Sequence, residues 1–315
     1  MNANLIRNGL FFSILSAIQI FLGIEQAFAK PELKPLGTTI ADMGSAYYQF
    51  KIKEFQSIDQ QRKYRVWLAI PKHLSNLNTS TQYSVQSTQG VASMFMLDGN
   101  SVMSRLNEPL LKTLAAHDAP VLVAMGYQTN LPFESASRSL DYTPADVSGL
   151  PSKDPRNPER MSGGSSQFRE LIVSEIMPWV ESEVRLDPQR KALWGHSYGG
   201  LFVLDSALNS RQFSYYFAAS PSLGWADQRI VKKIEQATVE QLKNQKLWIM
   251  EGDVDFDTLD KISPNADKNM IQNNRNIVQI MATKGSDVRL ILYPHLSHGE
   301  VFQRSLMDVL NYRLF

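Results

Sequence analysis

The sequence contains no cysteine, and this absence removes several kinds of chemistry at once. Without a thiol, the chain can form no disulfide, use no thiolate nucleophile, carry no lipidated cysteine and hold no cysteine-ligated zinc or iron–sulfur cluster. An excess of either charge is also missing, since 32 Lys and Arg stand against 31 Asp and Glu, for a formal net charge of +1. No global field would draw the protein to nucleic acid, so any recognition by charge must be local.

A hydrophobic run long enough to span a bilayer is missing as well. The most apolar stretch, residues 10–24, is shorter than the ~20 residues that a spanning helix needs. Arg7 is the only charge before it, and Ala27 and Ala29 follow as the small residues of a cleavage site. The pattern predicts a secretory signal peptide over residues 1–29, with an uncleaved membrane anchor as the alternative.

Apolar residues make up 43% and charged residues 20% of the 315 residues, which is typical of a globular chain with a large core. After residue 90, short continuous apolar runs alternate with segments of helical periodicity. This alternation predicts an α/β fold whose doubly wound, mostly parallel sheet has helices on both faces. The expected strands are 92–97, 121–125, 191–194, 215–219, 247–250 and 288–293, and the expected helices are 104–117, 167–184, 200–209, 228–244 and 268–285.

Two earlier runs, 47–55 and 64–70, alternate apolar with polar residues and favour antiparallel strands near an edge of the sheet. No internal repeat and no linker marks a second domain, so residues 30–315 are expected to form a single domain. The segment 128–164 breaks the rhythm of strands and helices. It is long and rich in Pro, Ser and Gly, and such a loop inside a compact domain indicates function or mobility.

The most informative motif is GHSYGG, from Gly195 to Gly200, which matches G-x-S-x-G. It lies between an expected buried strand and an apolar helix, the setting in which this pattern forms a nucleophile elbow. The sharp turn strains the backbone of Ser197, and the small residues at 195 and 199 relieve the crowding. Ser197 Oγ then stands at the carboxyl end of the sheet, where a helix N-terminus favours negative charge. An ordinary glycine-containing turn is the alternative.

A catalytic serine needs a general base, and the histidines after the last expected strand are the candidates. His295 and His298 both lie where the fold's order of nucleophile, acid and base puts the base. His298 is preferred because Gly299 and a helix beginning near Val301 follow it, whereas His295 lies against the strand end. His196 is expected to point away from the elbow and to be structural.

The acid of a triad is expected after the strand 247–250. Residues 251–257 include four carboxylates, of which Asp255 has the best offset from the strand. A solvated acidic loop is the alternative for each carboxylate. The alternative for the site is a Ser–His dyad in which a backbone carbonyl orients the imidazole.

An oxyanion hole needs two backbone donors aimed at the tetrahedral oxygen. One is expected at the N–H of Tyr198, which follows the nucleophile. The other is expected at Asn100, after the strand 92–97, with Gly99 as the neighbour that permits the tight turn.

With these residues the sequence resembles the putative-esterase branch of the α/β-hydrolases. Within it, the likeness is to the periplasmic esterases that open the trilactone of catecholate siderophores such as enterobactin and salmochelin. GHSYGG marks only the superfamily, but YQTNLPF and SRSLDYTP are narrower, because generic hydrolase chemistry does not require them. The matching stretches, in consistent order, are MLDGNSVMSRL from Met96, VAMGYQTNLPFESASRSLDYTP from Val123, SGGSSQFREL from Ser162, LWGHSYGGLFVLDS from Leu193, ASPSLG from Ala219, IMEG from Ile249 and LSHGEVF from Leu296.

The resemblance implies an ester hydrolase in the periplasm with Ser197 as nucleophile and His298 as base. It also implies a dyad without a firm acid, which weakens the case for Asp255. No metal or organic cofactor is expected, and the small-molecule substrate is an anionic siderophore, ferric or iron-free. No nucleic-acid partner is expected, and only an uncleaved N-terminal segment would tether the protein to a membrane.

An anionic tri-catecholate needs local positive charge in a chain that is almost neutral overall. Arg138, in SRSLDYTP, is expected to line the pocket, and Arg156 and Arg160 are further candidates; solvated loop arginines are the alternative. The aromatic residues that could pack on catechol rings, or belong to the core, are Tyr127, Phe133, Tyr142 and Trp225, and Tyr142 is the one expected to bind the substrate. The alternative functions are a general carboxylesterase or a feruloyl or acyl esterase of the same fold, and a non-catalytic siderophore binder.

Overall fold

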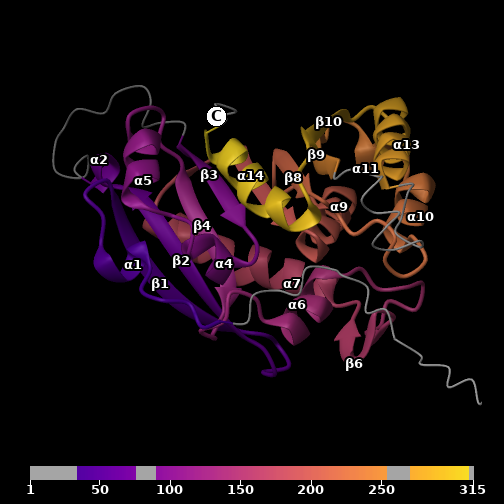
Figure 1. Cartoon of the computed structure of the whole chain (residues 1–315), viewed down its shortest axis with the longest axis horizontal. Coiled ribbons are helices and arrows are strands. Elements are labelled where there is room, and N and C mark those ends of the chain that lie inside the picture. Colours follow the sequence, from indigo (N-terminus) through magenta and orange to yellow (C-terminus); the bar gives the residue numbers. More distant parts are fainter. Residues whose placement is uncertain (1–33, 76–89, 254–269, 312–315) are drawn as a thin grey trace, which may run out of the picture.

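The computed structural model describes residues 34–75, 90–253 and 270–311. They form an eight-stranded sheet in the order β1-β2-β4-β3-β7-β8-β9-β10, which Figure 1 shows running from indigo β1 and β2 at the left to orange β9 and β10 at the right. Strand β2 pairs antiparallel with β1 and β4, and every other neighbouring pair is parallel. The α/β fold with a mostly parallel sheet is confirmed, as is the antiparallel pair at its edge.

The elements follow the alternation in the sequence. The strands are β1 (Tyr48–Gln56), β2 (Lys63–Pro71), β3 (Val91–Met96), β4 (Val121–Tyr127), β5 (Ser152–Asp154), β6 (Asn157–Ser162), β7 (Leu186–His196), β8 (Tyr215–Ala219), β9 (Lys246–Asp253) and β10 (Asp287–Pro294). The helices are α1 (Ile40–Met43), α2 (Lys72–Ser75), α4 (Gly99–Met103), α5 (Glu108–Ala115), α6 (Ser135–Tyr142), α7 (Ser165–Leu171), the π-helical turn η2 (Ile172–Ile176), α8 (Met177–Glu183), α9 (Tyr198–Asn209), α10 (Arg229–Gln236), α11 (Val239–Leu242), α13 (Met270–Thr283) and α14 (His298–Asn311). Each helix in the described ranges is too short or too polar to cross a lipid bilayer.

Helices cover both faces of the sheet, because alternate side chains of each buried strand enter different cores. On β7, Leu193 packs in the core shared with α7 and α9, whereas Trp194 packs in the core shared with α5 and α14. Strand β3 alternates in the same way, with Phe95 in the first core and Met96 in the second. Strands apolar on both sides therefore read as continuous apolar runs in the sequence.

The segment 128–164, expected to be a loop, is more ordered than its composition predicts. It contains the helix α6 and the small antiparallel hairpin β5–β6, which lies beside α6 at the lower edge of the view in Figure 1. The side chain of Glu134 accepts a hydrogen bond from the Ser137 N–H and so caps α6. Polar α6 did not stand out as a helix, because the apolar spacing that reveals helices is absent from it.

Two of the expected helices differ from their predicted ranges. Residues 104–117 begin just after the end of α4 at Met103, and their helix is α5, where Asn107 accepts a hydrogen bond from the Leu110 N–H as the N-cap. Residues 228–244 are divided between α10 and α11 by a capping box of Thr238 and Gln241. In both places a local capping side chain begins a new helix where periodicity alone predicts a continuous one.

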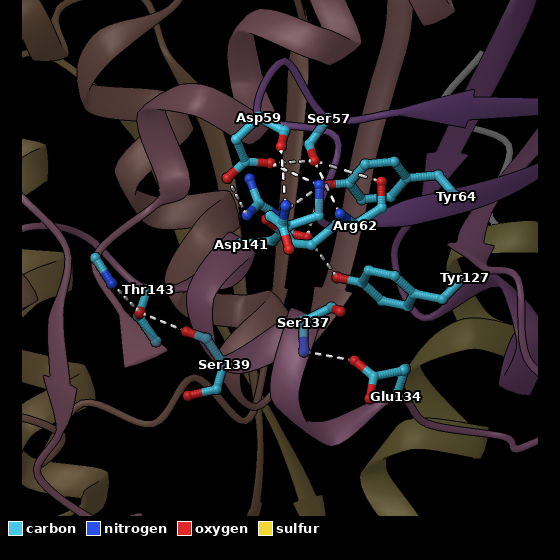
Figure 2. A network of polar contacts seen from close by, with 12 residues as sticks. Ser57, Asp59, Arg62, Tyr64, Tyr127, Glu134, Ser137, Ser139, Asp141 and Thr143 are labelled. Atoms are coloured by element: carbon cyan, nitrogen blue, oxygen red, sulfur yellow. Dashed lines mark hydrogen bonds and ion pairs between the residues drawn. The ribbon is translucent and has the colours of Figure 1, made fainter. Parts of the chain in front are cut away.

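A buried polar network attaches α6 to the sheet. Asp141, on α6, is fully buried, and its Oδ1 lies 2.9 Å from Nε of Arg62. Its Oδ2 accepts hydrogen bonds from the hydroxyls of Tyr64 on β2 (3.0 Å) and Tyr127 at the end of β4 (3.1 Å). Figure 2 shows these side chains converging on the carboxylate, with Asp59 on the outer side of Arg62. The network fixes the helix that carries Arg138.

We expect Asp141→Ala to lower the free energy of unfolding by about 3 kcal/mol or more, because it leaves the buried Arg62 cation and two tyrosine hydroxyls without their shared acceptor. Urea denaturation at pH 8 measures the change. Glu54→Ala is the matched control, because Glu54 forms an exposed ion pair with Arg65 (3.3 Å) and should cost less than about 1 kcal/mol. Equal effects of the two changes would contradict the role assigned to Asp141.

Candidate active site

The turn between β7 and α9 has the strained backbone that the sequence predicts. Ser197 has φ +61° and ψ −114°, a conformation that an L-residue adopts only when its surroundings impose it. Its N–H donates to the carbonyl of Ala219 on β8 (2.9 Å). A Cβ at Gly195 would lie 2.6 Å from the carbonyl oxygen of Gly199, so glycine is required there. Ser197 is half-buried, which leaves its hydroxyl accessible.

The second position at which the turn requires glycine is 200 rather than 199. A Cβ at Gly199 would meet nothing closer than a Leu97 carbon at 3.4 Å, an ordinary contact. A Cβ at Gly200 would lie 2.8 Å from Cα of Pro221. The expectation for Gly199 is therefore wrong, because at this end of the turn the loop after β8 approaches Gly200 and not Gly199.

His298 is the histidine that the structure places against Ser197. Its Nε2 lies 3.1 Å from Ser197 Oγ, and it is the first residue of α14. His295 is exposed instead, with φ +62°, and its backbone N–H donates to Asp253 Oδ1 (2.6 Å). The helix begins at His298 itself and not near Val301, so the imidazole is carried by a regular element.

His196 does not point away from the site, contrary to the expectation. Its Nε2 donates a hydrogen bond to the backbone carbonyl of His298 (2.7 Å), and the two rings lie 4.7 Å apart. Burial holds the pKa of His196 well below its usual range, with a further contribution from His298, so the ring is neutral. As the last residue of β7, it faces the side of the sheet that α14 covers. It thereby joins the strand before the nucleophile to the residue that bears the base.

The imidazole of His298 is held in its neutral form. Burial, together with the positive charges of Arg156 and Arg138, lowers the pKa of His298 to about 4. A neutral Nε2 within hydrogen-bond distance of the Ser197 hydroxyl can accept its proton. The arrangement is chemically that of a serine nucleophile with its general base.

Across residues 34–75, 90–253 and 270–311, no carboxylate contacts His298. Glu251, at the end of β9, is buried elsewhere and accepts hydrogen bonds from Ser220 Oγ (2.7 Å) and Asn274 Nδ2 (3.0 Å). Burial raises the pKa of this carboxyl to about 7. Asp255 lies outside the described residues, so its part in a triad stays a prediction. The described site is a Ser–His pair.

The two expected oxyanion donors lie at helix starts. Tyr198 opens α9 and Asn100 lies in the first turn of α4, where backbone N–H groups have no acceptor within the helix. The Asn100 side chain locks the loop: its Oδ1 accepts from the Tyr127 N–H (2.8 Å) and its Nδ2 donates to the Tyr127 carbonyl (3.0 Å). Their joint role as an oxyanion hole stays a prediction.

Gly99 is needed for a different reason than a tight turn. The positive φ of this loop (+52°) belongs to Asp98 and not to the glycine. A Cβ at Gly99 would instead lie 2.6 Å from the backbone of Met125 on β4. The glycine therefore allows the start of α4 to approach the neighbouring strand.

Arg138 lies at the site, but its charge is already paired. Its Nε and Nη2 donate to the two carboxylate oxygens of Asp98, both at 2.9 Å, and its side chain is only 12% exposed. Nothing in the sequence marked Asp98 as the partner of Arg138. The guanidinium carbon also lies 5.7 Å from the centre of the Tyr198 ring. Arg138 thus supports the loop that carries the expected oxyanion donor.

Tyr142 cannot contact a substrate in this conformation, so the expectation for it is wrong. It is fully buried, and its hydroxyl accepts a hydrogen bond from the Asp98 N–H (3.1 Å). The ring packs against Phe168 and Phe202 because it lies on the inner side of α6. Arg138, Asp141 and Tyr142 follow helical spacing, and recognising α6 would have predicted their shared inward direction.

The other candidates take different places. Arg160 lies half-buried on β6, and its contact with substrate stays a prediction. Tyr127 and Trp225 belong to the core, whereas Phe133 is half-buried and meets Phe302 edge-on.

Ser222 was missed by the sequence analysis, although ASPSLG contains it. Its Oγ lies 3.2 Å from Ser197 Oγ, and its N–H donates to the Ser197 carbonyl (3.3 Å). Only the return of the chain after β8 brings it to the elbow.

Residues 82–312 match a family model described as "Putative esterase". The apo-salmochelin esterase of Escherichia coli O6:H1 is 41% identical over 285 residues, covering 90% of this chain and 85% of that protein. Ferri-bacillibactin esterase BesA of Bacillus subtilis is 28% identical, covering 64% of this chain and 68% of that protein. Among solved structures, the enterobactin hydrolase IroE in complex with DFP matches with a TM-score of 0.69 and 39% identity, covering 86% of this chain and 97% of the other.

The low pKa of His298 predicts the acidic limit of activity. A base acts only when deprotonated, so kcat/KM for a neutral ester such as p-nitrophenyl acetate should stay high below pH 6.5 and fall nearer pH 4. Among the described residues, Arg156 and Arg138 act on His298 through their charge, and the neutral ring of His196 lies 4.7 Å from its ring. Initial rates of nitrophenolate release from pH 4 to 9 measure the limit, with circular dichroism to confirm folding. A limit at or above pH 6.5 would contradict this electrostatic environment.

Proposed function

This chain belongs to the putative esterase family of α/β-hydrolases, and we propose that it is a serine esterase that hydrolyses the lactone bonds of a catecholate siderophore of the enterobactin or salmochelin kind. The observation that carries the proposal is the 3.1 Å contact between His298 Nε2 and Ser197 Oγ on a strained elbow. The names of the relatives support the substrate class, since they include esterases of salmochelin, bacillibactin and enterobactin. A non-catalytic binder would need neither the strain nor the base.

The first half of the mechanism forms an acyl-enzyme. Ser197 Oγ attacks a lactone carbonyl carbon while His298 Nε2 takes the hydroxyl proton. The carbonyl oxygen gains negative charge, and the N–H groups of Tyr198 and Asn100 donate to it at the starts of α9 and α4. The C–O bond of the lactone then breaks, and the leaving alkoxide takes the proton from His298. The opened siderophore is now esterified to Ser197.

The second half releases the product. Water attacks the acyl carbon, His298 accepts one proton from that water, and the same proton passes to Ser197 Oγ as the ester bond breaks. His196 holds the His298 carbonyl through both halves, so the base keeps its position without a carboxylate contact from the described residues. Iron, when present, is cargo of the substrate and takes no part in bond making.

Digestion of the iron-free trilactone, followed by chromatography, tests the proposal. The wild-type protein should convert the cyclic compound to its linear trimer or shorter products. Ser197→Ala should slow this conversion by roughly 10³-fold or more, because the nucleophile is lost while the fold is kept. A phosphorofluoridate should add its phosphoryl group to the wild-type protein with loss of fluoride, and intact mass should show no adduct on the Ser197→Ala variant.

The rival functions give different results in the same assay. If short aliphatic or feruloyl esters are cleaved far faster than the trilactone, the protein is a general or feruloyl esterase. If the trilactone binds and neither protein cleaves any ester, the protein is a binder and the enzymatic proposal falls.

We also propose that the protein acts in the periplasm after export through residues 1–29. The support is the run 10–24 between Arg7 and the small residues Ala27 and Ala29. Expression of the full chain in a Gram-negative host should yield a periplasmic protein whose N-terminal residue is Lys30. An N-terminus at Met1 in a membrane fraction would indicate anchoring, and a chain confined to the cytoplasm would contradict export.

A further inference from the structure

One buried carboxylate clamps the β5–β6 hairpin to the nucleophile elbow. Asp154, the last residue of β5, is 1% exposed. It accepts hydrogen bonds from side chains of three other segments: Ser139 Oγ on α6 (2.6 Å), Tyr198 OH on α9 (3.1 Å) and Trp225 Nε1 after β8 (3.0 Å). These bonds hold the pKa of Asp154 below its usual range against the effect of burial, so the carboxylate is ionised.

The clamp also sets the turn of the hairpin. The same carboxylate accepts a hydrogen bond from the backbone N–H of Arg156 (2.9 Å), two residues further on. Since Tyr198 follows the nucleophile directly, a turn tied to the Tyr198 hydroxyl lies beside the catalytic pair. The hairpin is therefore a fixed part of the site's wall.

Arg156 extends from this turn to the active site. The residue is exposed, and its guanidinium carbon lies 5.9 Å from the centre of the Tyr198 ring. Its charge is among those that depress the pKa of His298, which requires the guanidinium to be close to that imidazole. The side chain thus presents a positive charge near the base while its backbone is anchored.

The other cation near the site is less suited to bind an anion. Arg138 contacts the same Tyr198 ring, but its guanidinium is bound at both edges by Asp98 and is largely buried. A substrate would have to break that pair to use its charge. Arg156 is the exposed one of the two.

We propose that Arg156 is the specificity-determining residue of the site, which binds an anionic, oxygen-rich group of the ester substrate such as a catecholate, and that Asp154 is the positioning residue that holds it there. The proposal rests on the esterase function proposed above and names the residue that selects the anionic substrate. A guanidinium donates several hydrogen bonds in one plane, which suits the paired oxygens of a catecholate. The adjacent Tyr198 ring supports the guanidinium by a cation–π contact.

The test compares an anionic with a neutral substrate at pH 8, where His298 is neutral in every variant. Arg156→Gln should lower kcat/KM for the trilactone roughly 10- to 100-fold, mainly through KM, and change p-nitrophenyl acetate hydrolysis by less than about threefold. Arg156→Lys should recover part of the loss. Lys153→Gln is the matched control, because it removes an exposed charge from the same hairpin and should leave kcat/KM for both substrates unchanged.

Two further measurements distinguish loss of the Arg156 charge from a general disturbance of the fold. With p-nitrophenyl acetate, Arg156→Gln should move the acidic limit of activity toward higher pH, because a positive charge near His298 is lost while Arg138 and His196 remain. Lys153→Gln should not move it. Asp154→Asn should lower trilactone kcat/KM more than acetate kcat/KM, whereas a merely structural residue would affect both substrates equally.

The inference and the proposed function can fail separately. If the wild-type protein cleaves the trilactone but Arg156→Gln changes kcat/KM for both substrates equally, or for neither, the role of Arg156 is overturned and the proposed function stands. If the wild-type protein leaves the trilactone intact, the function falls. A pair of p-nitrophenyl esters with and without a carboxylate on the acyl chain then decides whether Arg156 selects anions, and no charge preference would overturn the inference.

Discussion

The strained backbone of Ser197 is the constraint on which the rest of the site depends. A φ of +61° persists only because the surroundings leave no alternative: β8 accepts the Ser197 N–H through Ala219, and close packing excludes a side chain at Gly195. The hydroxyl then stands at the carboxyl end of β7, at the start of α9. His298 can serve as base only because this geometry brings Ser197 Oγ to its Nε2. The helix start, the base and the loop around Asn100 all take their positions relative to this one turn.

Buried carboxylates hold together what a chain without cysteine cannot cross-link. Asp98 pairs with Arg138, Asp141 with Arg62, and Asp154 with three donors from different segments. Each binds groups from elements that are far apart in sequence, and these ionic and hydrogen-bonding partners offset part of the cost of burying the carboxylate. Together they make the segment 128–164 part of the active-site wall, although its composition resembles a loop.

Much of the fold could be predicted from the sequence, because β-strands covered on both faces leave continuous apolar runs and the surrounding helices leave regular spacing. The elbow and its base could also be predicted, because the local turn motif identifies Ser197 as the nucleophile and the order of residues along the chain identifies His298 as the base. Helix α6 could not, because its stability comes from a cap and from buried polar contacts that periodicity does not register. For the same reason Tyr142 was assigned to the substrate when it belongs to the core.

The sequence by itself determined the chemistry available: a serine and a histidine in the order of an esterase, no thiol, and arginines in 128–164 as candidates to bind an anionic substrate. Only the tertiary structure decided which arginine side chains are buried in the fold and which are exposed at the site. Arg138 and Arg156 look alike in the sequence, yet one is bound to Asp98 and the other is exposed beside Tyr198. The physical reason is that a side chain's partners come from segments far away in the chain, and a carboxylate such as Asp98 neutralises an arginine only once folding has brought them together.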